Sequence, residues 1–498
     1  MNQLRLDFEQ HTSVHQLTKP AGYKGLYGFH KYWGKKPAET VSFLVEQLSE
    51  PGEVVLDPFL GSGAIVREAL MRERRVIASD LNPVAIELAS LVADPPSATE
   101  MQRALKDIES KMRPEIDRSY PLPDGTTATH YLWQGNELRQ VWTKGSNGKL
   151  RVELVPSVAD MAVVEKFRDY QPKALRPLHL FRNSRINSVW NMQWRDLFTG
   201  RALRNLELLR DAILEVSTAR VRHALLMVLT ASSGQMSKMV FAIEKRGKAS
   251  GDIRNGRVEV GSWVIGLWRP ELHFEINVWN CFDNKAQALV RGLQRERKYG
   301  YSPRMSGRPL DVVEGRAEVS LVNTDATDLL ATLPEGSVDL LVTDPPHGDR
   351  IPYLELSEIW NAILGRTPLF EQEIVVSNAT ERGKTSELYA ERMKRVFQMA
   401  GQALSPDGRL AIMFNSRSEE EWGGLISATE AGHFHFCGCF PMTYSAGSVV
   451  QDNRSGALKH DYVLVFVPSR CSNQSEAVRG RLGNLPNWTD QMPKVGEQ

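Results

Sequence analysis

Two short segments of this 498-residue chain carry acidic residues where a catalytic site would need them. The first, DPFLGSG at Asp57–Gly63, follows an apolar run and precedes a helical stretch. A glycine-rich turn in that place lets backbone amides approach a ligand closely, and the helix N-terminus adds partial positive charge. Asp80 ends the next apolar run, where a carboxylate can accept both hydroxyls of a ribose. The two features together predict a site for a nucleoside-containing cofactor.

The spacing of the glycines disfavours two common nucleotide sites. It is not GxGxxG, and no GK[ST] follows, so the turn is neither typical of a nicotinamide site nor of a phosphate loop. The second segment, TDPPHGDRIPY at Thr343–Tyr353, comes directly after the apolar run VDLLV. By itself an Asp-Pro-Pro is as consistent with a sharp turn as with a catalytic acid. Its meaning depends on the elements around it.

Alternating strands and helices are expected to position both segments. Residues 38–48 have the period of an amphipathic helix, and the apolar runs at 53–57 and 75–80 each end in an acid. A helical stretch follows each run, to about Arg72 and through Leu91. The order strand, helix, strand, helix predicts an α/β doubly wound fold with a parallel sheet.

The α/β pattern stops at about Pro95 and resumes only near Gly315. The second part contains the runs VSLVNTD, SVDLLVTDPP and GRLAIMFN, a helix near 387–404, and the closing runs FHFCGCFPM and DYVLVFVP. We therefore expect a Rossmann-like sheet interrupted by one large insertion domain. The expected limits are 20–95 and 313–468 for the two halves of the catalytic domain, 96–312 for the insertion, and 469–498 for a polar, loose tail.

Composition excludes several other classes of protein. Apolar residues make up 42% and charged residues 24%, as in ordinary globular proteins. No run reaches the roughly 18 apolar residues of a membrane span, and the start lacks the apolar core of a signal peptide, so a cytoplasmic location is expected. The net charge is only +1, so any nucleic-acid surface must be local. The four cysteines form no CxxC pair, and Cys437 and Cys439 alternate in an apolar run, which predicts buried strand residues rather than a metal site.

Residues 30–63, HKYWGKKPAETVSFLVEQLSEPGEVVLDPFLGSG, resemble the amino-methyltransferases of DNA, in which a Lys-Pro segment and a helix lead into an LDPFxGSG loop. The alternative for HKYWGKKP is a basic, aromatic surface loop. The resemblance implies a Rossmann-like methyltransferase fold that binds S-adenosyl-L-methionine, with the loop around the methionine and sugar, Asp80 on the ribose and Asp325 on the adenine. The cofactor-binding residues that it implies are His30, Lys36, Pro37, Asp57, Pro58, Phe59, Gly61, Gly63, Asp80, Asn82 and Asp325.

The family's catalytic loop is an acidic or polar residue, two prolines and an aromatic residue, which correspond here to Asp344, Pro345, Pro346 and His347. An exocyclic base amine is a poor nucleophile because its lone pair is delocalised into the ring. The Asp344 carboxylate and the Pro345 carbonyl would accept its two hydrogens and localise the pair toward the methyl donor. His347 departs from the usual tyrosine or phenylalanine. A neutral imidazole can still stack on an extruded base, but it can also become charged near neutral pH.

The resemblance predicts a site-specific DNA methyltransferase that acts on the N6 amine of adenine by base flipping. Asp344 favours adenine, because cytosine-directed relatives usually carry serine at that place. Tyr353 and Trp360 are further candidates for the wall of the base pocket, although packing in a helix core is the favoured interpretation for both. Cytosine-N4 methylation, an RNA base substrate and an inactive nucleic-acid-binding subunit are the alternatives.

The insertion is the expected target-recognition domain, and double-stranded DNA is the expected partner. Other subunits of a modification or defence system are further possible partners, since restriction-linked protection, phage defence and regulation all use this chemistry. No cysteine precedes Cys281, which argues against the zinc ribbon that some large DNA methylases carry in the insertion. A second basic cluster, at Arg291–Lys298, is as consistent with a helix face as with a DNA contact. The residues predicted to bind nucleic acid are Lys238, Lys245, Arg246, Lys248, Arg254 and Arg257.

Overall fold

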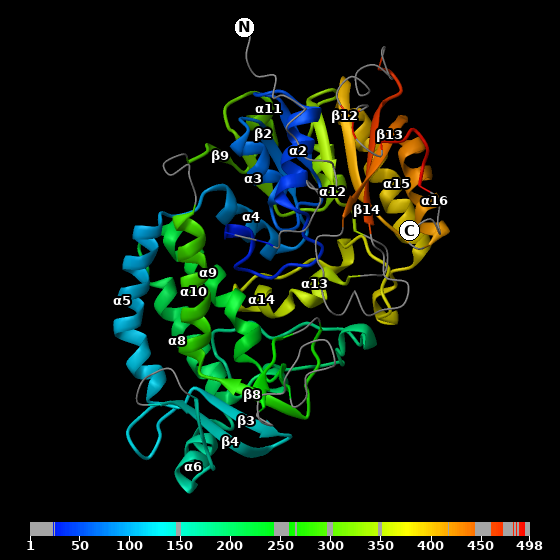
Figure 1. The fold of residues 1–498 in the computed structure, drawn as a ribbon. Helices are drawn as coiled ribbons and strands as arrows, with labels where there is room; N and C mark the ends of the chain where they lie inside the picture. The colour runs from blue at the N-terminus through cyan, green and yellow to red at the C-terminus, as the bar shows by residue number, and fades with distance from the viewer. Residues whose placement is uncertain are drawn as a thin grey trace.

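The computed structural model contains two β-sheets with helices between them, and further helices cover the outer face of the larger sheet (Figure 1). The structure describes residues 23, 25–145, 151–243, 258–263, 266–295, 302–346, 351–416, 418–443, 460–471, 482, 485 and 488–493. One sheet has eight strands and comes from the two ends of the chain. The other has six strands and comes entirely from residues between 130 and 276.

The eight-stranded sheet is parallel except at one strand. Its order is β13-β14-β12-β11-β1-β2-β10-β9, and β14 runs antiparallel to both of its neighbours. The predicted Rossmann-like α/β sheet, interrupted between its second and third long strands by an insertion, is confirmed. The strands are β1 (Val54–Asp57), β2 (Arg75–Ser79), β9 (Met305–Ser306), β10 (Val319–Val322), β11 (Val338–Thr343), β12 (Leu404–Phe414), β13 (Phe434–Thr443) and β14 (His460–Pro468).

Helices cover both faces of this sheet, and apolar spacing explains their placement. Helix α2 (Ala38–Leu48) buries Val41, Leu44, Val45 and Leu48, which lie on one face of a helix with 3.6 residues per turn. Helices α3 (Ala64–Met71) and α4 (Pro83–Ala93) share that side of the sheet. The opposite side is covered by α11 (Pro309–Val313), α12 (Ala326–Ala331), α15 (Ser386–Ala403) and α16 (Glu419–Ala431).

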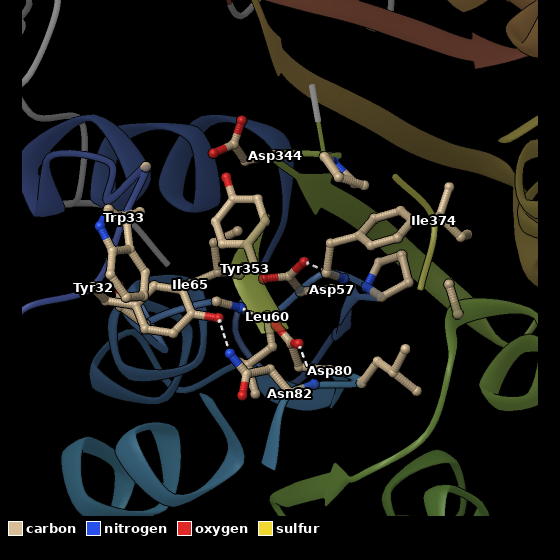
Figure 2. Close-up of a pocket in the computed structure, with 18 of the residues that line it drawn as sticks. Tyr32, Trp33, Asp57, Leu60, Ile65, Asp80, Asn82, Asp344, Tyr353 and Ile374 are labelled. Atoms are coloured by element: carbon tan, nitrogen blue, oxygen red, sulfur yellow. Dashed lines mark hydrogen bonds between the residues drawn. The ribbon is translucent and has the colours of Figure 1, made fainter. Parts of the chain in front are cut away.

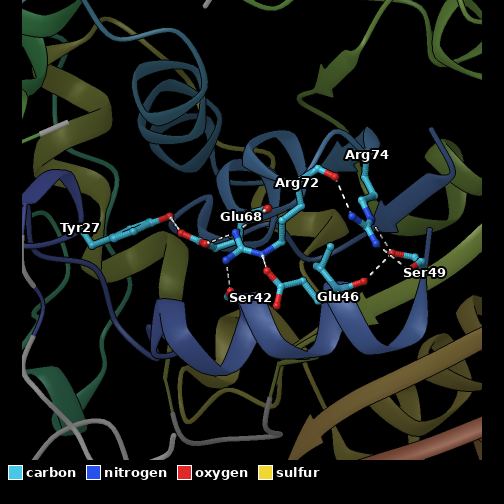
Figure 3. A network of polar contacts seen from close by, with 8 residues as sticks. Tyr27, Ser42, Glu46, Ser49, Glu68, Arg72 and Arg74 are labelled. Carbon is cyan, nitrogen blue, oxygen red and sulfur yellow. Dashed lines mark hydrogen bonds and ion pairs between the residues drawn. The ribbon is translucent and has the colours of Figure 1, made fainter. Parts of the chain in front are cut away.

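A polar network ties α2 to α3 at the edge of the sheet (Figure 3). The Arg72 guanidinium contacts the Glu46 carboxylate at 2.6 Å and the Glu68 carboxylate at 2.7 Å. The Tyr27 hydroxyl donates to the same Glu68 side chain at 2.5 Å. These contacts join the chain just before α2 to the helix that follows the glycine-rich turn, so the predicted cofactor segment is held as one unit.

The insertion packs directly against the eight-stranded sheet's helices. Its helix α9 (Ala219–Ser233) contacts α4 and also α14 (Glu358–Ile363), and one hydrophobic cluster runs through all three. The other helices of the insertion are α5 (Ala98–Asp117), α6 (Val158–Phe167), α7 (Trp194–Leu197), α8 (Gly200–Leu214) and α10 (Val278–Gln294). Its sheet has the order β5-β4-β3-β8-β6-β7, with β3 (His130–Gln134), β4 (Glu137–Lys144), β5 (Arg151–Leu154), β6 (Val240–Ile243), β7 (Glu259–Val260) and β8 (Leu272–Ile276).

Two details near the C-terminus differ from the simple alternation of the sequence. Cys437 and Cys439 are buried in β13 as predicted, but a bulge at this point places them in the cores on opposite faces of the sheet. The expected loose tail is wrong for the residues that return to this strand: Cys439 and Thr489 exchange backbone hydrogen bonds of 2.8 and 3.0 Å, and Leu482 is fully buried. Trp488 packs over Gly438, which explains why this polar segment is anchored.

In the part of the chain that the structure describes, no helix is long and apolar enough to cross a membrane. Within the same residues, no group of three or more histidine, cysteine or acidic side chains is arranged to hold a metal ion.

We expect Gly63→Ala to lower the free energy of unfolding. Gly63 has a φ of +81°, and a Cβ atom there would lie 2.7 Å from the Ala89 Cα atom of α4. The control is Gly52→Ala, which has a similar φ of +87° but nothing within 4 Å of the added atom. Urea unfolding should show a loss of about 1 kcal/mol for the control from backbone strain and about 1–3 kcal/mol more for Gly63→Ala from overpacking. Equal losses would show that α4 yields to the added atom.

Candidate active site

The glycine-rich turn and the Asp-Pro-Pro loop meet because β1 and β11 are neighbours in the sheet. The strands pair in parallel, with Val55 opposite Leu340 and Leu56 opposite Leu341, so their carboxyl ends lie side by side. The Thr343 hydroxyl at the end of β11 lies 3.3 Å from the Asp57 carboxylate at the end of β1. Both loops open into one cavity with an empty volume of about 950 Å³.

Most of the residues predicted for the cofactor site and the catalytic loop line this cavity. The lining includes Lys36, Asp57, Pro58, Phe59, Gly61, Asp80, Asn82, Asp325, Asp344 and Pro346. His347 lies outside the residues that the structure describes. Pro345 lines a second cavity of about 780 Å³, next to α15 and α16. The cofactor residues and the acid of the catalytic loop therefore share one space.

Asp57 is a fully buried carboxylate. Its Oδ1 atom accepts a hydrogen bond from the Phe59 amide at 3.1 Å, whereas its buried Oδ2 atom has no hydrogen-bond partner among the described residues. Burial raises the pKa of Asp57 well above its usual value. A buried oxygen without a donor is costly, so this position is suited to a ligand that brings an N–H or O–H group.

Asp80 holds the glycine-rich turn in shape. Its two oxygens accept backbone hydrogen bonds from Gly61 and Asn82, each at 2.8 Å. Burial raises the pKa of Asp80 to about 6, despite these hydrogen bonds. The carboxylate is thus fixed in orientation and still faces the cavity (Figure 2).

Asn82 lines the cavity, but its side chain is engaged within the protein. Its Nδ2 group donates to the Ser357 hydroxyl at 2.8 Å and contacts the Tyr32 hydroxyl at 3.3 Å. Its Oδ1 atom accepts a hydrogen bond from the side-chain Nδ2 group of Asn361 at 3.0 Å. The geometry gives Asn82 the role of an anchor between the cofactor turn and α14.

Asp325 caps the start of α12. Its side chain accepts hydrogen bonds from the backbone amides of Thr327, at 2.8 Å, and Asp328, at 3.1 Å. Burial works against ionisation here, but a hydrogen bond from the Thr327 hydroxyl, together with those from the two amides, leaves the pKa of Asp325 below its usual value. An ionised acid therefore stands at the edge of the cavity next to β10.

Asp344 at the end of β11 is paired with a lysine. The Lys36 ammonium lies 3.2 Å from the Asp344 Oδ1 atom and 2.8 Å from the Asp461 Oδ2 atom. The Asp-Pro-Pro loop makes a second contact two residues later, because the Tyr389 hydroxyl donates to the Pro346 carbonyl at 2.6 Å.

Aromatic rings form one wall of the cavity, and the sequence identified them only in part. Tyr32 and Tyr353 lie nearly parallel, with ring centroids 6.2 Å apart, and the Tyr353 hydroxyl is directed toward Asp344 (Figure 2). Trp33 stacks on Trp360 with centroids 4.9 Å apart. The predicted packing in a helix core is confirmed for Trp360, which is buried in α14. Tyr353 instead begins α13 (Tyr353–Leu356) and lines the cavity.

Three residues predicted to bind the cofactor lie outside the cavity wall: His30, Pro37 and Gly63. His30 is a correction. It is 3% exposed, contacts the Thr230 hydroxyl of α9 at 3.0 Å, and burial lowers its pKa to about 3. It is thus a neutral packing residue that joins this loop to the insertion. Pro37 and Gly63 are the N-cap residues of α2 and α3.

The chain after the catalytic loop is clamped by buried ion pairs. The Arg382 guanidinium contacts Glu355 at 2.9 Å and Glu373 at 2.6 Å, and Glu373 also lines the cavity. The Arg176 guanidinium of the insertion binds both oxygens of Glu358, at 2.8 and 2.9 Å. Sequence reasoning missed these residues, because no local pattern connects charges that are so far apart along the chain.

The predicted nucleic-acid contacts are described only at Lys238. Its ammonium donates to the Arg195 carbonyl at 2.8 Å, and burial lowers its pKa. Lys245, Arg246, Lys248, Arg254 and Arg257 lie outside the described residues. Among the tryptophans of the insertion, Trp190 and Trp268 are the most exposed, at 58% and 44%.

Residues 7–91 match the N6/N4-type methyltransferase family, whose description is DNA methylase. The match covers HKYWGKKP, the glycine-rich turn and Asp80, and it supports the resemblance to amino-methyltransferases over this part of the chain. The eight-stranded sheet has the Rossmann-like α/β fold that this resemblance implies. No curated protein sequence matches the chain.

Two solved structures are similar to the fold. A candidate DNA modification methylase from Thermus thermophilus, solved with S-adenosyl-L-methionine, is 17% identical over 29% of this chain, with a TM-score of 0.18. The matched part spans about half of that protein, 51%. An rRNA methyltransferase from Streptomyces viridochromogenes is 11% identical, with 92% of this chain and 98% of that chain covered and a TM-score of 0.28.

We expect Asp57→Asn to stabilise the protein more at high pH than at low pH. The raised pKa means that folding favours the protonated acid, so the associated stability is complete below the usual pKa and is lost as pH rises through the raised value. The variant does not titrate, so its unfolding free energy relative to the wild type should increase in urea unfolding as the pH rises above about 4, the usual pKa of the acid.

The control for this measurement is Asp124→Asn on an exposed turn. Hydrogen bonds from Thr126 lower the pKa of Asp124, so this substitution should show no such increase. A pH-independent difference for Asp57→Asn would mean that the Asp57 carboxyl has an ordinary pKa in the folded chain.

Proposed function

We propose that this chain is an S-adenosyl-L-methionine-dependent DNA methyltransferase that transfers a methyl group to the N6 amine of adenine. The observation that carries the proposal is the single cavity shared by Asp57, Asp80 and Asp344 at the ends of adjacent strands. Two of these acids suit a nucleoside-containing cofactor, and the third suits an amine that must become nucleophilic. The match of residues 7–91 to DNA methylases supports the same conclusion.

The residues of the cavity fit the proposed cofactor. The buried Asp57 Oδ2 atom has no donor among the described residues and would accept one from the ligand. Gly61 has a φ of +57°, and a Cβ there would meet only ordinary contacts, so the turn leaves room beside it. Asp80 would accept the ribose hydroxyls, and Asp325 would contact the adenine. When bound, S-adenosyl-L-methionine supplies a methyl group on a positively charged sulfur.

Asp344 and the carbonyl of Pro345 prepare the amine. Each accepts a hydrogen bond from one N–H group of the exocyclic amine, which turns the nitrogen lone pair toward the methyl group. The bound cofactor would supply the methyl group and keep the sulfur as the leaving group, and Asp344 would accept the proton that the nitrogen loses. The base has to leave the duplex to reach this cavity. The rings of Tyr353 and His347 are the proposed packing partners of the base, which for His347 rests on the resemblance alone.

The choice of adenine rests on the resemblance, because Asp344 is the first residue of the catalytic loop and cytosine-directed members of the family usually carry serine there. The insertion, residues 96–312, is proposed to recognise the target, with the basic residues between 238 and 257 on the phosphates and double-stranded DNA as the partner. Identifying the modified base and the modified polymer distinguishes this proposal from cytosine methylation and from an RNA substrate.

Expression in a methylation-deficient bacterial host should produce a methylated adenine in a defined DNA motif. Asp344→Ala should reduce methylation by at least about 100-fold, because no side-chain acceptor remains. Asp344→Asn should retain more activity, since its amide oxygen still accepts one N–H bond. The control is Asp124→Ala on an exposed turn. The measurement is DNA sequencing by a method that detects both modified adenine and modified cytosine.

Each other outcome of this experiment has a distinct meaning. A modified cytosine would overturn the choice of base, and labelled methyl transfer to RNA alone would overturn the choice of polymer. Methylation that persists in Asp344→Ala would overturn the role of the catalytic loop.

Cofactor affinity should rise with pH. An ionised Asp80 accepts ribose hydroxyls better than a protonated one, and its pKa is about 6. Between about pH 5 and about pH 7 the dissociation constant for S-adenosyl-L-methionine should therefore fall by about tenfold in calorimetric titrations. Asp80→Asn should bind more weakly at pH 7 and show a flatter profile. An unchanged profile in that variant would assign the titration to another group, with Asp57 the first to test.

A further inference from the structure

Lys36, Asp344 and Asp461 form an ion cluster at the rim of the cavity. They come from three separate elements: the loop before α2, the end of β11 and the start of β14. The Lys36 ammonium lies between the two carboxylates, 3.2 Å from Asp344 and 2.8 Å from Asp461. The side chains are 9%, 16% and 7% exposed, respectively, so water screens the cluster poorly.

The two oxygens of Asp344 face different surroundings. Oδ1 is the atom next to Lys36. Oδ2 lies on the side of Gly34, where an added Cβ would be 3.8 Å from it and 3.0 Å from the Tyr353 hydroxyl. Gly34 has a φ of +69°, and the absence of a side chain there keeps this approach open. The Lys36 charge therefore faces one oxygen at ion-pair distance, and the other oxygen lies on the aromatic side of the cavity.

We propose that Lys36 is a positioning residue for Asp344, with Asp461 as its counter-ion, and that it is not a cofactor-binding residue. This inference rests on the proposed function, because it assigns Asp344 the role of accepting the base amine. The lysine fixes the rotation of the carboxylate so that Oδ2 points to the amine.

Asp461 has a specific part in this arrangement. A lone lysine would neutralise Asp344 and compete with the base amine for the carboxylate. Shared between two carboxylates, the single positive charge leaves the cluster with a net charge of −1. The attraction at these distances is strong in a site with little water, and the second acid keeps part of the negative charge of Asp344 available. The cluster thus orients the acceptor without cancelling it.

Kinetics with purified protein and a DNA substrate test the positioning role. Lys36→Met should lower kcat by about 100-fold, as a displaced catalytic group does, while the dissociation constant for S-adenosyl-L-methionine stays within about twofold. Lys36→Arg should restore a large part of kcat, because it keeps the charge between the two acids. Lys106→Met, on the exposed face of α5, is the control. Weakened cofactor binding with unchanged kcat would overturn the inference and make Lys36 a cofactor residue.

A second measurement does not depend on methyl transfer. In the wild type, acetylation of Lys36 by an amine-reactive ester should be slow, and Asp461→Asn should raise its rate at least about tenfold relative to Lys106 in the same molecule, as mass spectrometry of the peptides would show. Equal rates in the two proteins would overturn the ion cluster itself. An inactive wild type with the expected acetylation pattern would overturn the proposed function and leave the cluster intact, whereas an active wild type with an unaffected Lys36→Met would overturn only the positioning role.

Discussion

The parallel pairing of β1 with β11 is the constraint on which the site depends. β2 lies on one side of β1 and β12 lies on the far side of β11, so the connections that follow β1 and β11 run in opposite directions along the sheet. At such a point the loops after the two strands diverge and leave a crevice at the carboxyl edge of the sheet. The glycine-rich turn comes from one strand and Asp344 from the other. A shift of this register by a single residue would turn Asp57 or Asp344 away from the crevice.

That arrangement places several acids close together in a poorly solvated space, which works against the stability of the empty protein. Burial is the main reason why the pKa values of Asp57 and Asp80 are raised, and Asp344 adds to the effect on Asp57. Backbone amides offset part of this cost, because Phe59, Gly61 and Asn82 all donate to the two carboxylates. Protonation relieves part of the remainder, and a ligand that donates hydrogen bonds would compensate it as well. Binding and folding are therefore coupled at the same side chains.

The insertion forms a separate sheet and supports the cavity wall from behind, because its residues pack against lining residues without lining the cavity themselves. Trp263 of the insertion packs edge-on against Trp33 of the amino-terminal loop and against Trp360 of α14, with centroids 6.4 and 5.7 Å apart. His30 reaches Thr230 of α9, and Lys31 lies 4.4 Å from the Trp263 ring. A rigid movement of the insertion relative to the sheet would disturb these contacts first. Events at the insertion are thereby physically linked to the loop that carries Lys36.

The sequence predicts the sheet well because its signals are local. Each central strand is an apolar run with an acid at or just beyond its end, and buried parallel strands require that composition on both faces. For the same reason Asp57, Asp80 and Asp344 could be placed at one edge before any coordinates: parallel strands end on the same side. The insertion was predicted as a break in the pattern, but its six-stranded sheet was not, since its short strands carry no comparable signal.

The errors and omissions concern contacts made across the chain. His30 lies in a segment whose order suggests a cofactor role, yet α9, about 200 residues later, buries its ring. Tyr32, Trp33 and Tyr353 have the residue types of a base pocket, but which aromatic faces the cavity is decided by packing partners that spacing does not reveal. Lys36 is the clearest case. Its neighbours in sequence suggest a role in cofactor binding. Its neighbours in space are Asp344 and Asp461, which follow the insertion in the sequence. A motif therefore predicts which residues matter at this site, and only the fold determines what each of them contacts.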